Sequence, residues 1–402
     1  MPRRVTRRRT SSSPGAAEAN PVVAAAPRGG VEGILEGATR LFPPSTNLDK
    51  PNRAPGEREK GQPFYNPGMA LNRDLSVLLV EAFAKSKGRE IDVADALAGT
   101  GARSVRLACE VGAPILVHAN DGQPEALAAI RKTVAANETR GRVRITEGDA
   151  HILLATRRFD VVDLDPCGSP MPFLDAAMRS TRHEGLLCAT ATDTGALAGK
   201  FPRVTKRRYD AHHGLHKMSW RAEVGLRILA GAMVRSAARF ERVATPVLSV
   251  SSGHWMRVVC RVEDGKRDAD VGLKQLGFAV ASEPAGSFQT ERPATGAWAG
   301  PLWTGPLHDA TLLEGMAAAV EGKTLAQPKA TTELLDLLRN EASAPPFWVV
   351  PDLLQKRFGA PPRRDVLMER LRAAGFKATR SHIDPQGVRT NADLASVQTS
   401  WN

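Results

Sequence analysis

The chain has 402 residues, of which 42% are hydrophobic and 24% charged, a composition typical of globular proteins with two or three domains. It carries 55 Lys and Arg against 43 Asp and Glu, and this net charge of +12 favours a polyanionic partner, most simply nucleic acid. A basic tail or a general arginine bias is the alternative explanation. The sequence contains no apolar run of about 18 residues, which argues against a membrane span.

The first 60 residues are rich in Pro, Gly, Arg, Ser and Ala and show little periodicity, so we predict a basic, largely disordered N-terminal arm and lead-in over 1–60. The arginine- and serine-rich run 3–13 has no acidic residue and is also typical of an organellar transit peptide. A basic arm is the simpler interpretation. No compact apolar region suggests a secretory signal.

From residue 75 to 262, short apolar runs alternate with amphipathic segments, which predicts parallel βαβ units in a doubly wound, mostly parallel sheet of the α/β class. The predicted strands are 91–96, 115–120, 143–146, 159–165 and 186–192, followed by an antiparallel pair, 243–250 and 255–262, with a short connection. The predicted helices are 103–111, 124–138 and 217–240. These elements define a domain over 61–264, and a change in character after it predicts a smaller α+β domain over 265–402.

The four cysteines show no C-x-x-C spacing: Cys109, Cys167, Cys188 and Cys260. This pattern fits neither a disulfide framework nor a structural zinc site. We therefore expect no metal and a reducing, cytoplasmic compartment.

Polar residues follow the first three predicted strands, where an open parallel sheet binds its ligands. Gly99 and Gly101 follow the first strand, but Ser104 stands where a dinucleotide fingerprint needs glycine. Asp121 follows the second strand and could accept hydrogen bonds from both hydroxyls of a ribose. Asp149 and Ala150 follow the third strand and could reach an adenine amine. An adenosine-type ligand without a pyrophosphate fits better than NAD, although each acid alone could be a helix cap.

The fourth strand ends in the run Asp163–Pro170, with the sequence DLDPCGSP. Strand alternation places Asp163 and Asp165 on one side of the pleat, and two acids there are costly to bury without a role. Capping of loops and helices is the alternative. A carboxylate and a carbonyl of the Pro166 turn can accept both protons of an exocyclic amine, and the carboxylate can stabilise the charge that develops on nitrogen.

This run resembles the signature of the tRNA guanine-N2 dimethyltransferases, and other blocks match that family in order, from about residue 31 to 395. These blocks are 64–76 (FYNPGMALNRDLS), 189–194 (ATATDT), 223–229 (EVGLRIL) and 378–382 (ATRSH). The resemblance implies a class I methyltransferase fold over 61–264, a tRNA-binding C-terminal domain, and S-adenosyl-L-methionine as cofactor. It implies transfer of one or two methyl groups to guanine N2 at position 26 of tRNA.

The family's functional residues map onto this sequence. The resemblance implies that Arg73, Arg103 and Asp121 contact the cofactor, together with the adenine-side pair Asp149 and Ala150. It also implies that Asp165 is catalytic.

Cys167 departs from the family pattern, which usually has an aromatic residue after the Asp-Pro pair. A thiol cannot stack on a base as an aromatic ring does, so the way Pro166 and Cys167 contact the target base is in question. A nucleophilic role for Cys167 is not expected, because methylation of an amine needs no covalent adduct.

The segment 203–217 is basic and follows the fifth strand, so it should lie near the mouth of the site. We expect Lys206, Arg207 and Arg208 to contact RNA phosphates and Tyr209 to stack on a base. The alternative is a solvated basic loop.

Three rival functions remain. The first is methylation of another RNA guanine, such as one in rRNA. The second is methylation of DNA adenine, which Pro-Cys-Gly disfavours because those enzymes usually carry an aromatic residue there. The third is a non-catalytic RNA-binding protein on a methyltransferase scaffold. No obligate protein partner is evident.

Overall fold

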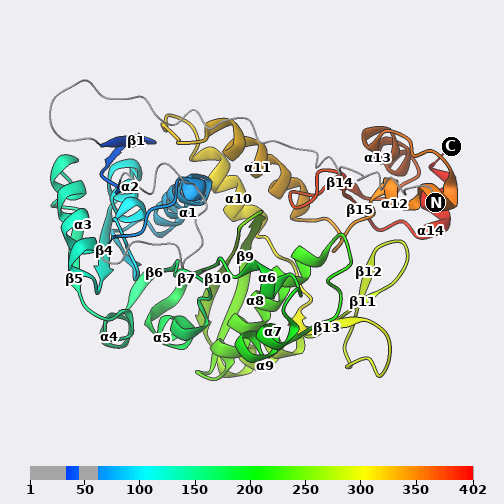
Figure 1. The fold of residues 1–402 in the computed structure, drawn as a ribbon, viewed down its shortest axis with the longest axis horizontal. Helices are drawn as coiled ribbons and strands as arrows, with labels where there is room; N and C mark the ends of the chain where they lie inside the picture. Colours follow the sequence, from blue (N-terminus) through cyan, green and yellow to red (C-terminus); the bar gives the residue numbers. More distant parts are fainter. Residues whose placement is uncertain (1–32, 45–61, 402) are drawn as a thin grey trace, which may run out of the picture.

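The centre of the computed structural model, which describes residues 33–44 and 62–401, is a seven-stranded sheet (Figure 1). Its strand order is β5-β4-β3-β6-β7-β10-β9, and the first five strands are parallel. β10 pairs antiparallel with both β7 and β9, as the predicted terminal hairpin requires. The strands are β3 (Ile91–Asp95), β4 (Ile115–Asp121), β5 (Val143–Glu147), β6 (Phe159–Leu164), β7 (Thr181–Ala191), β9 (Arg242–Ser252) and β10 (Trp255–Asp264). The predicted doubly wound, mostly parallel α/β sheet is confirmed.

Helices cover both faces of the sheet because its strands are apolar on both sides. Successive residues of a strand point to opposite faces, so Val161 packs into one hydrophobic core and Val162 into the other. One face carries α1 (Ala70–Lys87), α2 (Ala102–Glu110) and α3 (Pro124–Ala136). The other face carries α4 (Ala150–Thr156), α5 (Leu174–Ser180) and α8 (Arg221–Ala238).

The basic segment between β7 and α8 contains regular secondary structure. It holds α6 (Thr194–Leu197), α7 (Pro202–Tyr209) and the two-residue strand β8 (His212–His213). Pro202 occupies the first turn of α7, where its missing N–H costs no hydrogen bond.

Residues 33–44 form a short hairpin of β1 (Ile34–Glu36) and β2 (Thr39–Leu41), which differs from the disordered arm predicted for 1–60. The hairpin is held because Glu36 is fully buried and pairs with Arg73 and Arg106. Three-residue strands are too short to give a periodic signal. The other residues of the predicted arm lie outside the described residues.

Three strands of the C-terminal region pair with β8 in an antiparallel sheet, order β12-β11-β13-β8, and β14 and β15 form a two-stranded sheet. The smaller α+β part of the predicted fold is therefore present. Its elements are α9 (Lys266–Lys274), β11 (Leu276–Ala281), β12 (Gly286–Gln289), β13 (Trp298–Trp303), α10 (Ala310–Ala318), α11 (Pro328–Glu341), α12 (Pro351–Phe358), α13 (Arg364–Ala373), β14 (Ala378–Arg380), β15 (Val388–Thr390) and α14 (Leu394–Thr399). No helix within 33–44 and 62–401 combines the length and hydropathy needed to cross a membrane.

Contacts cross the predicted domain division at residue 265. The division into two domains stays a prediction. Strand β8 pairs with β13, and Leu313 and Leu335 of α10 and α11 belong to the same core as α1. The carboxylate of Asp74 in α1 accepts hydrogen bonds from the backbone N–H groups of Ala326 and Gln327, at 3.0 and 2.8 Å. The start of α11 is thus attached to α1.

Candidate active site

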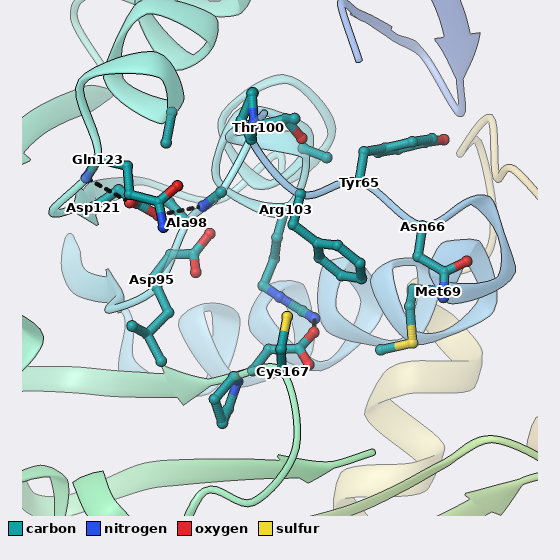
Figure 2. Close-up of a pocket in the computed structure, with 18 of the residues that line it drawn as sticks. Tyr65, Asn66, Met69, Asp95, Ala98, Thr100, Arg103, Asp121, Gln123 and Cys167 are labelled. Atoms are coloured by element: carbon teal, nitrogen blue, oxygen red, sulfur yellow. Dashed lines mark hydrogen bonds and ion pairs between the residues drawn. The ribbon is translucent and has the colours of Figure 1, made fainter. Parts of the chain in front are cut away.

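A cavity of about 350 Å³ lies at the carboxyl ends of β3, β4 and β6 (Figure 2). The chain runs from β3 outward to β5 and then returns to β6 on the other side of β3, so the cavity sits where the strand order reverses. Ligands of open parallel sheets bind at this point. The residues that line it include Phe64, Tyr65, Asn66, Met69, Arg73, Asp95, Gly99, Thr100, Arg103, Asp121, Gln123, Asp165, Pro166, Cys167 and Phe173.

The glycine loop after β3 forms one wall of the cavity. Gly99 has a φ of +56°, and a side chain there would place its Cβ 2.9 Å from the carbonyl oxygen of Phe64. The carboxylate of Asp121 accepts hydrogen bonds from the N–H groups of Gly99 and Gln123, at 2.9 and 3.0 Å. Asp121 therefore fixes the loop while it faces the cavity, which agrees with the place predicted for it.

The carboxylate of Asp165 contacts the guanidinium of Arg103, which extends from α2 toward the loop that carries Cys167 (Figure 2). Arg103 also donates to Asn72 at 2.9 Å and to the hydroxyl of Ser76, both on α1. These two contacts with α1 orient Arg103, and Arg103 in turn orients the carboxylate of Asp165.

Arg257 of β10 holds the carboxylate of Asp163, and sequence reasoning missed this role. Its guanidinium donates to Asp163 at 2.5 and 3.2 Å and to Thr190 at 2.7 Å. Burial opposes ionisation of Asp163, but Arg103 and Arg257 hold its pKa below the usual range. Asp163 is buried and does not line the cavity, so its negative charge balances the positive charges of Arg103 and Arg257.

Asp95, at the end of β3, is a buried carboxyl that lines the cavity. Its side chain accepts a hydrogen bond from the hydroxyl of Ser104 at 2.6 Å. Burial raises the pKa of Asp95 to about 7, and the charges of Asp163 and Asp165 act in the same direction. Asp95 thus titrates near neutral pH, whereas an exposed aspartate titrates near 4.

We expect wild-type protein to gain about 2–3 kcal/mol of stability, relative to an Asp95→Asn variant, as the pH falls from 8 to 5. In this window the folded state binds a proton at Asp95 that the unfolded state does not, because only the folded-state pKa is raised to about 7. Urea unfolding of both proteins at several pH values measures the difference. An unchanged difference across the window would contradict the raised pKa.

Arg73 lines the cavity but is held by a carboxylate of the N-terminal hairpin. Its guanidinium pairs with Glu36 through two contacts of 2.6 and 2.5 Å, and it donates to the carbonyl oxygen of Asn66 at 3.1 Å. The hydroxyl of Tyr65 donates to the same carboxylate at 2.7 Å. The hairpin therefore fixes the segment 65–66 and Arg73 against the cavity.

Asp149 and Ala150 lie beside the cavity and are not among the residues that line it. The carboxylate of Asp149 caps α4 by accepting from the N–H of His151 at 2.6 Å. The ring of His151 packs 4.7 Å from that of Phe173, which does line the cavity. Contact of Asp149 and Ala150 with the cofactor stays a prediction.

Pro166 and Cys167 both line the cavity, and Cys167 is exposed. The cavity still has aromatic surface, because Phe64 and Phe173 line it as well. The motif around Phe64 was visible in the sequence, but the position of Phe173, nine residues after β6, gave no signal.

The predicted RNA-contacting cations lie on α7. Lys206, Arg207 and Arg208 are exposed, but Lys206 pairs with Asp210 and Arg208 pairs with Asp193 at 2.8 Å. The expectation that Tyr209 stacks on RNA is wrong. Its ring is fully buried and its hydroxyl donates to Asp193 at 2.6 Å, because the last turn of α7 packs against the core.

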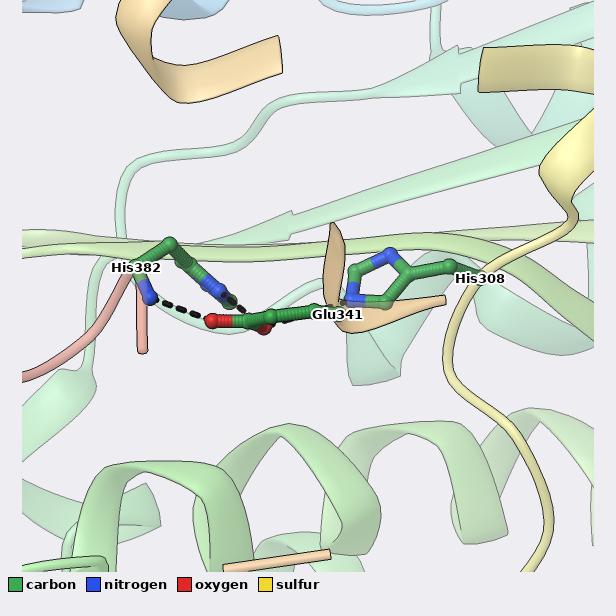
Figure 3. Close-up of side chains that lie close together, drawn as sticks. All are labelled: His308, Glu341 and His382. Carbon is green, nitrogen blue, oxygen red and sulfur yellow. Dashed lines mark hydrogen bonds and ion pairs between the residues drawn. The ribbon is translucent and has the colours of Figure 1, made fainter. Parts of the chain in front are cut away.

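One cluster in the described residues has the ligand types of a metal site: His308, Glu341 and His382 (Figure 3). The Nδ1 of His382 lies 2.7 Å from the carboxylate of Glu341, and the Nη2 of Arg389 lies 3.2 Å from the same oxygen. Arg389 also pairs with Glu223 of α8 at 2.6 Å. A cation already contacts the oxygen that a metal would need, so we interpret the cluster as a polar joint between the C-terminal region and α8. The absence of a metal site stays a prediction.

The sheet order, the glycine loop and the acids at the ends of β4 and β6 define a class I methyltransferase that uses S-adenosylmethionine. The model of the N2,N2-dimethylguanosine tRNA methyltransferase family matches residues 50–401. The chain belongs to this family.

Individual relatives agree over most of their length. The tRNA (guanine(26)-N(2))-dimethyltransferase of Methanothermobacter thermautotrophicus is 38% identical over 351 residues, covering 83% of this chain and 91% of the relative. The protein of the same name from Thermococcus kodakarensis is 37% identical with the same coverage. A solved structure of Trm1 from Pyrococcus horikoshii with S-adenosyl-L-methionine aligns with a TM-score of 0.78 at 31% identity, covering 92% of this chain and 99% of that one.

Proposed function

We propose that this chain transfers one or two methyl groups from S-adenosylmethionine to the exocyclic N2 amine of guanine 26 in tRNA. The observation that carries the proposal is the placement of Asp165 in the cavity, with Arg103 and the glycine loop beside it. Membership of the family and the names of its relatives support the substrate.

The donor groups of the cavity fit S-adenosylmethionine. The Gly99 loop brings backbone close to a ligand without a side chain in the way, and Asp121 offers carboxylate oxygens to a ribose. Arg73 and Arg103 would lie near its charged end, and Asp149 and Ala150 near its adenine. When bound, the cofactor supplies a methyl group on a positively charged sulfur.

Asp165 performs the chemistry on the acceptor. Guanine N2 is a weak nucleophile because its lone pair is delocalised into the ring. The carboxylate of Asp165 and a carbonyl of the Pro166 turn accept its two N–H groups and orient the lone pair toward the methyl group. As the nitrogen becomes positive, the carboxylate stabilises that charge and takes the proton.

The tRNA contacts that we propose outside the cavity come from α7, through Lys206, Arg207 and Arg208. Of these, Arg207 makes no ion pair with another described residue, so it can bind a phosphate without first breaking an ion pair of the protein. We place the protein in the cytoplasm, which the four unpaired cysteines support.

Labelled S-adenosylmethionine, supplied with an unmodified tRNA transcript and separately with unmodified rRNA, tests the proposal. We expect label in N2-methylated guanosine at position 26, and none when that guanine is replaced by adenine. Label in rRNA alone would support the rRNA alternative, and cofactor binding without label in any RNA would support the non-catalytic one.

A further inference from the structure

A second hollow, of about 490 Å³, lies between α6, the turn that joins β9 and β10, and the C-terminal segment near β15. Its lining includes Thr194 and Gly195 of α6, Ser251, Gly253 and Asp384. The segment that leads into α6 contacts the loop that carries Asp165. The N–H of Gly168 donates to the hydroxyl of Thr192 at 2.7 Å, and the N–H of Thr192 donates back to the carbonyl of Gly168 at 2.8 Å.

Phe201 follows Lys200, which lines this hollow, and 59% of the surface of Phe201 is exposed. Its ring packs against Gly195, since a Cβ on that glycine would lie 2.8 Å from the ring. The contact leaves much of the aromatic surface in solvent, where a large apolar group gains nothing for folding. Single exposed apolar residues are common, so only the residues around Phe201 can indicate whether its exposed ring has a binding role.

Three exposed cations surround Phe201 in the sequence: Lys200, Arg203 and Arg207. None of them forms an ion pair within the part of the chain that the structure describes. Arg203 and Arg207 are one turn apart, on the face of α7 opposite the buried residues Thr205 and Tyr209. The helix therefore presents a row of unpaired positive charge next to an exposed ring.

We propose that Phe201 stacks on an unpaired base of the RNA strand that carries the target nucleotide, while Lys200, Arg203 and Arg207 contact the phosphates of that strand. Single-stranded RNA is bound by this combination, because every base offers a face to an aromatic ring and every nucleotide carries a phosphate. Phe201 takes the role that Tyr209 cannot play. The inference rests on the proposed function, since the RNA is the substrate of that reaction.

The test measures binding of the full-length chain to an unmodified tRNA transcript. We expect Phe201→Ala to raise the Kd by roughly tenfold, which is the usual cost of losing one base–aromatic stack. Phe201→Trp should bind like wild type, and Phe201→Leu should bind as weakly as the alanine variant. Val271→Ala removes an equally exposed apolar side chain from α9 and should bind like wild type. An unchanged thermal midpoint shows that each variant is folded.

Two results would overturn the proposal: wild-type affinity in Phe201→Ala, or wild-type affinity in Phe201→Leu, which would leave no part for the aromatic ring. The charge-reversing variant Arg207→Glu should reduce the salt dependence of binding, and an unchanged salt slope would remove the phosphate contact. The readout is binding, so a protein that bound tRNA without methylating it would contradict the proposed function and still report on Phe201.

Discussion

Replacing Asp165 by Asn is expected to lower the rate of methyl transfer by about 10³-fold. The amide keeps the size of the side chain but cannot take the proton from guanine N2 or stabilise its positive charge. It also removes one of the two negative partners of Arg103, leaving Asp163. Single-turnover methyl transfer, at saturating cofactor and tRNA, measures the effect without a contribution from substrate affinity.

The control for this variant is Asp270→Asn, which changes an exposed aspartate of α9 that does not line the cavity. It should transfer methyl groups at the wild-type rate. Affinity of the Asp165→Asn variant for tRNA should stay within a few-fold of wild type, because phosphate contacts supply most of that affinity. A variant with the wild-type rate would show that Asp165 is not the reactive group.

The largest expected loss of stability follows from Arg106→Met, which should lower the free energy of unfolding by about 3–5 kcal/mol. Arg106 is fully buried and lies within 3.0 Å of Glu36, 2.6 Å of Asp74 and 2.7 Å of Glu110. Methionine fills most of its volume but leaves three carboxylates without their shared cation. Glu36 keeps Arg73, and Asp74 keeps its backbone donors, so the loss falls most heavily on Glu110.

Urea unfolding at pH 7 measures this loss, with Arg131→Met as the matched control. Arg131 is exposed and lies 3.9 Å from the exposed Glu147, so its removal should change the free energy of unfolding by less than about 0.5 kcal/mol. Equal stabilities of the two variants would mean that the buried charges around Arg106 rearrange without cost.

The sheet and much of its cavity could be predicted because each parallel strand leaves two signals in the sequence. Their apolar runs mark where each strand lies, and the polar residues just after each run mark the edge where ligands bind. Asp121 ends β4, Asp165 follows β6, and both line one cavity. The residues that balance their charges could not be found in this way. Arg257 lies in the middle of an apolar strand, and only the pairing of β10 with β7 brings it beneath Asp163.

Tyr209 and Glu36 are two residues whose burial could not be predicted from the local sequence. Tyr209 is surrounded by basic residues in the sequence, which suggests exposure, yet the period of α7 turns it inward. Glu36 lies in a segment of low complexity, yet it pairs with two arginines from distant helices. Arg73 lies 37 residues and Arg106 lies 70 residues further along the chain. Side-chain burial depends on these distant partners, which local patterns do not reveal.

The attachment of α11 to α1 limits how this enzyme can be divided experimentally. A chain shortened to end near residue 264 would lack the backbone donors of Asp74 and the apolar side chains of α10 and α11 that cover α1. Its α1 carries Asn72 and Ser76, which hold Arg103 against Asp165. Such a fragment would therefore be a poor source of a minimal catalytic module, and point variants of the intact chain are the better way to separate RNA affinity from chemistry.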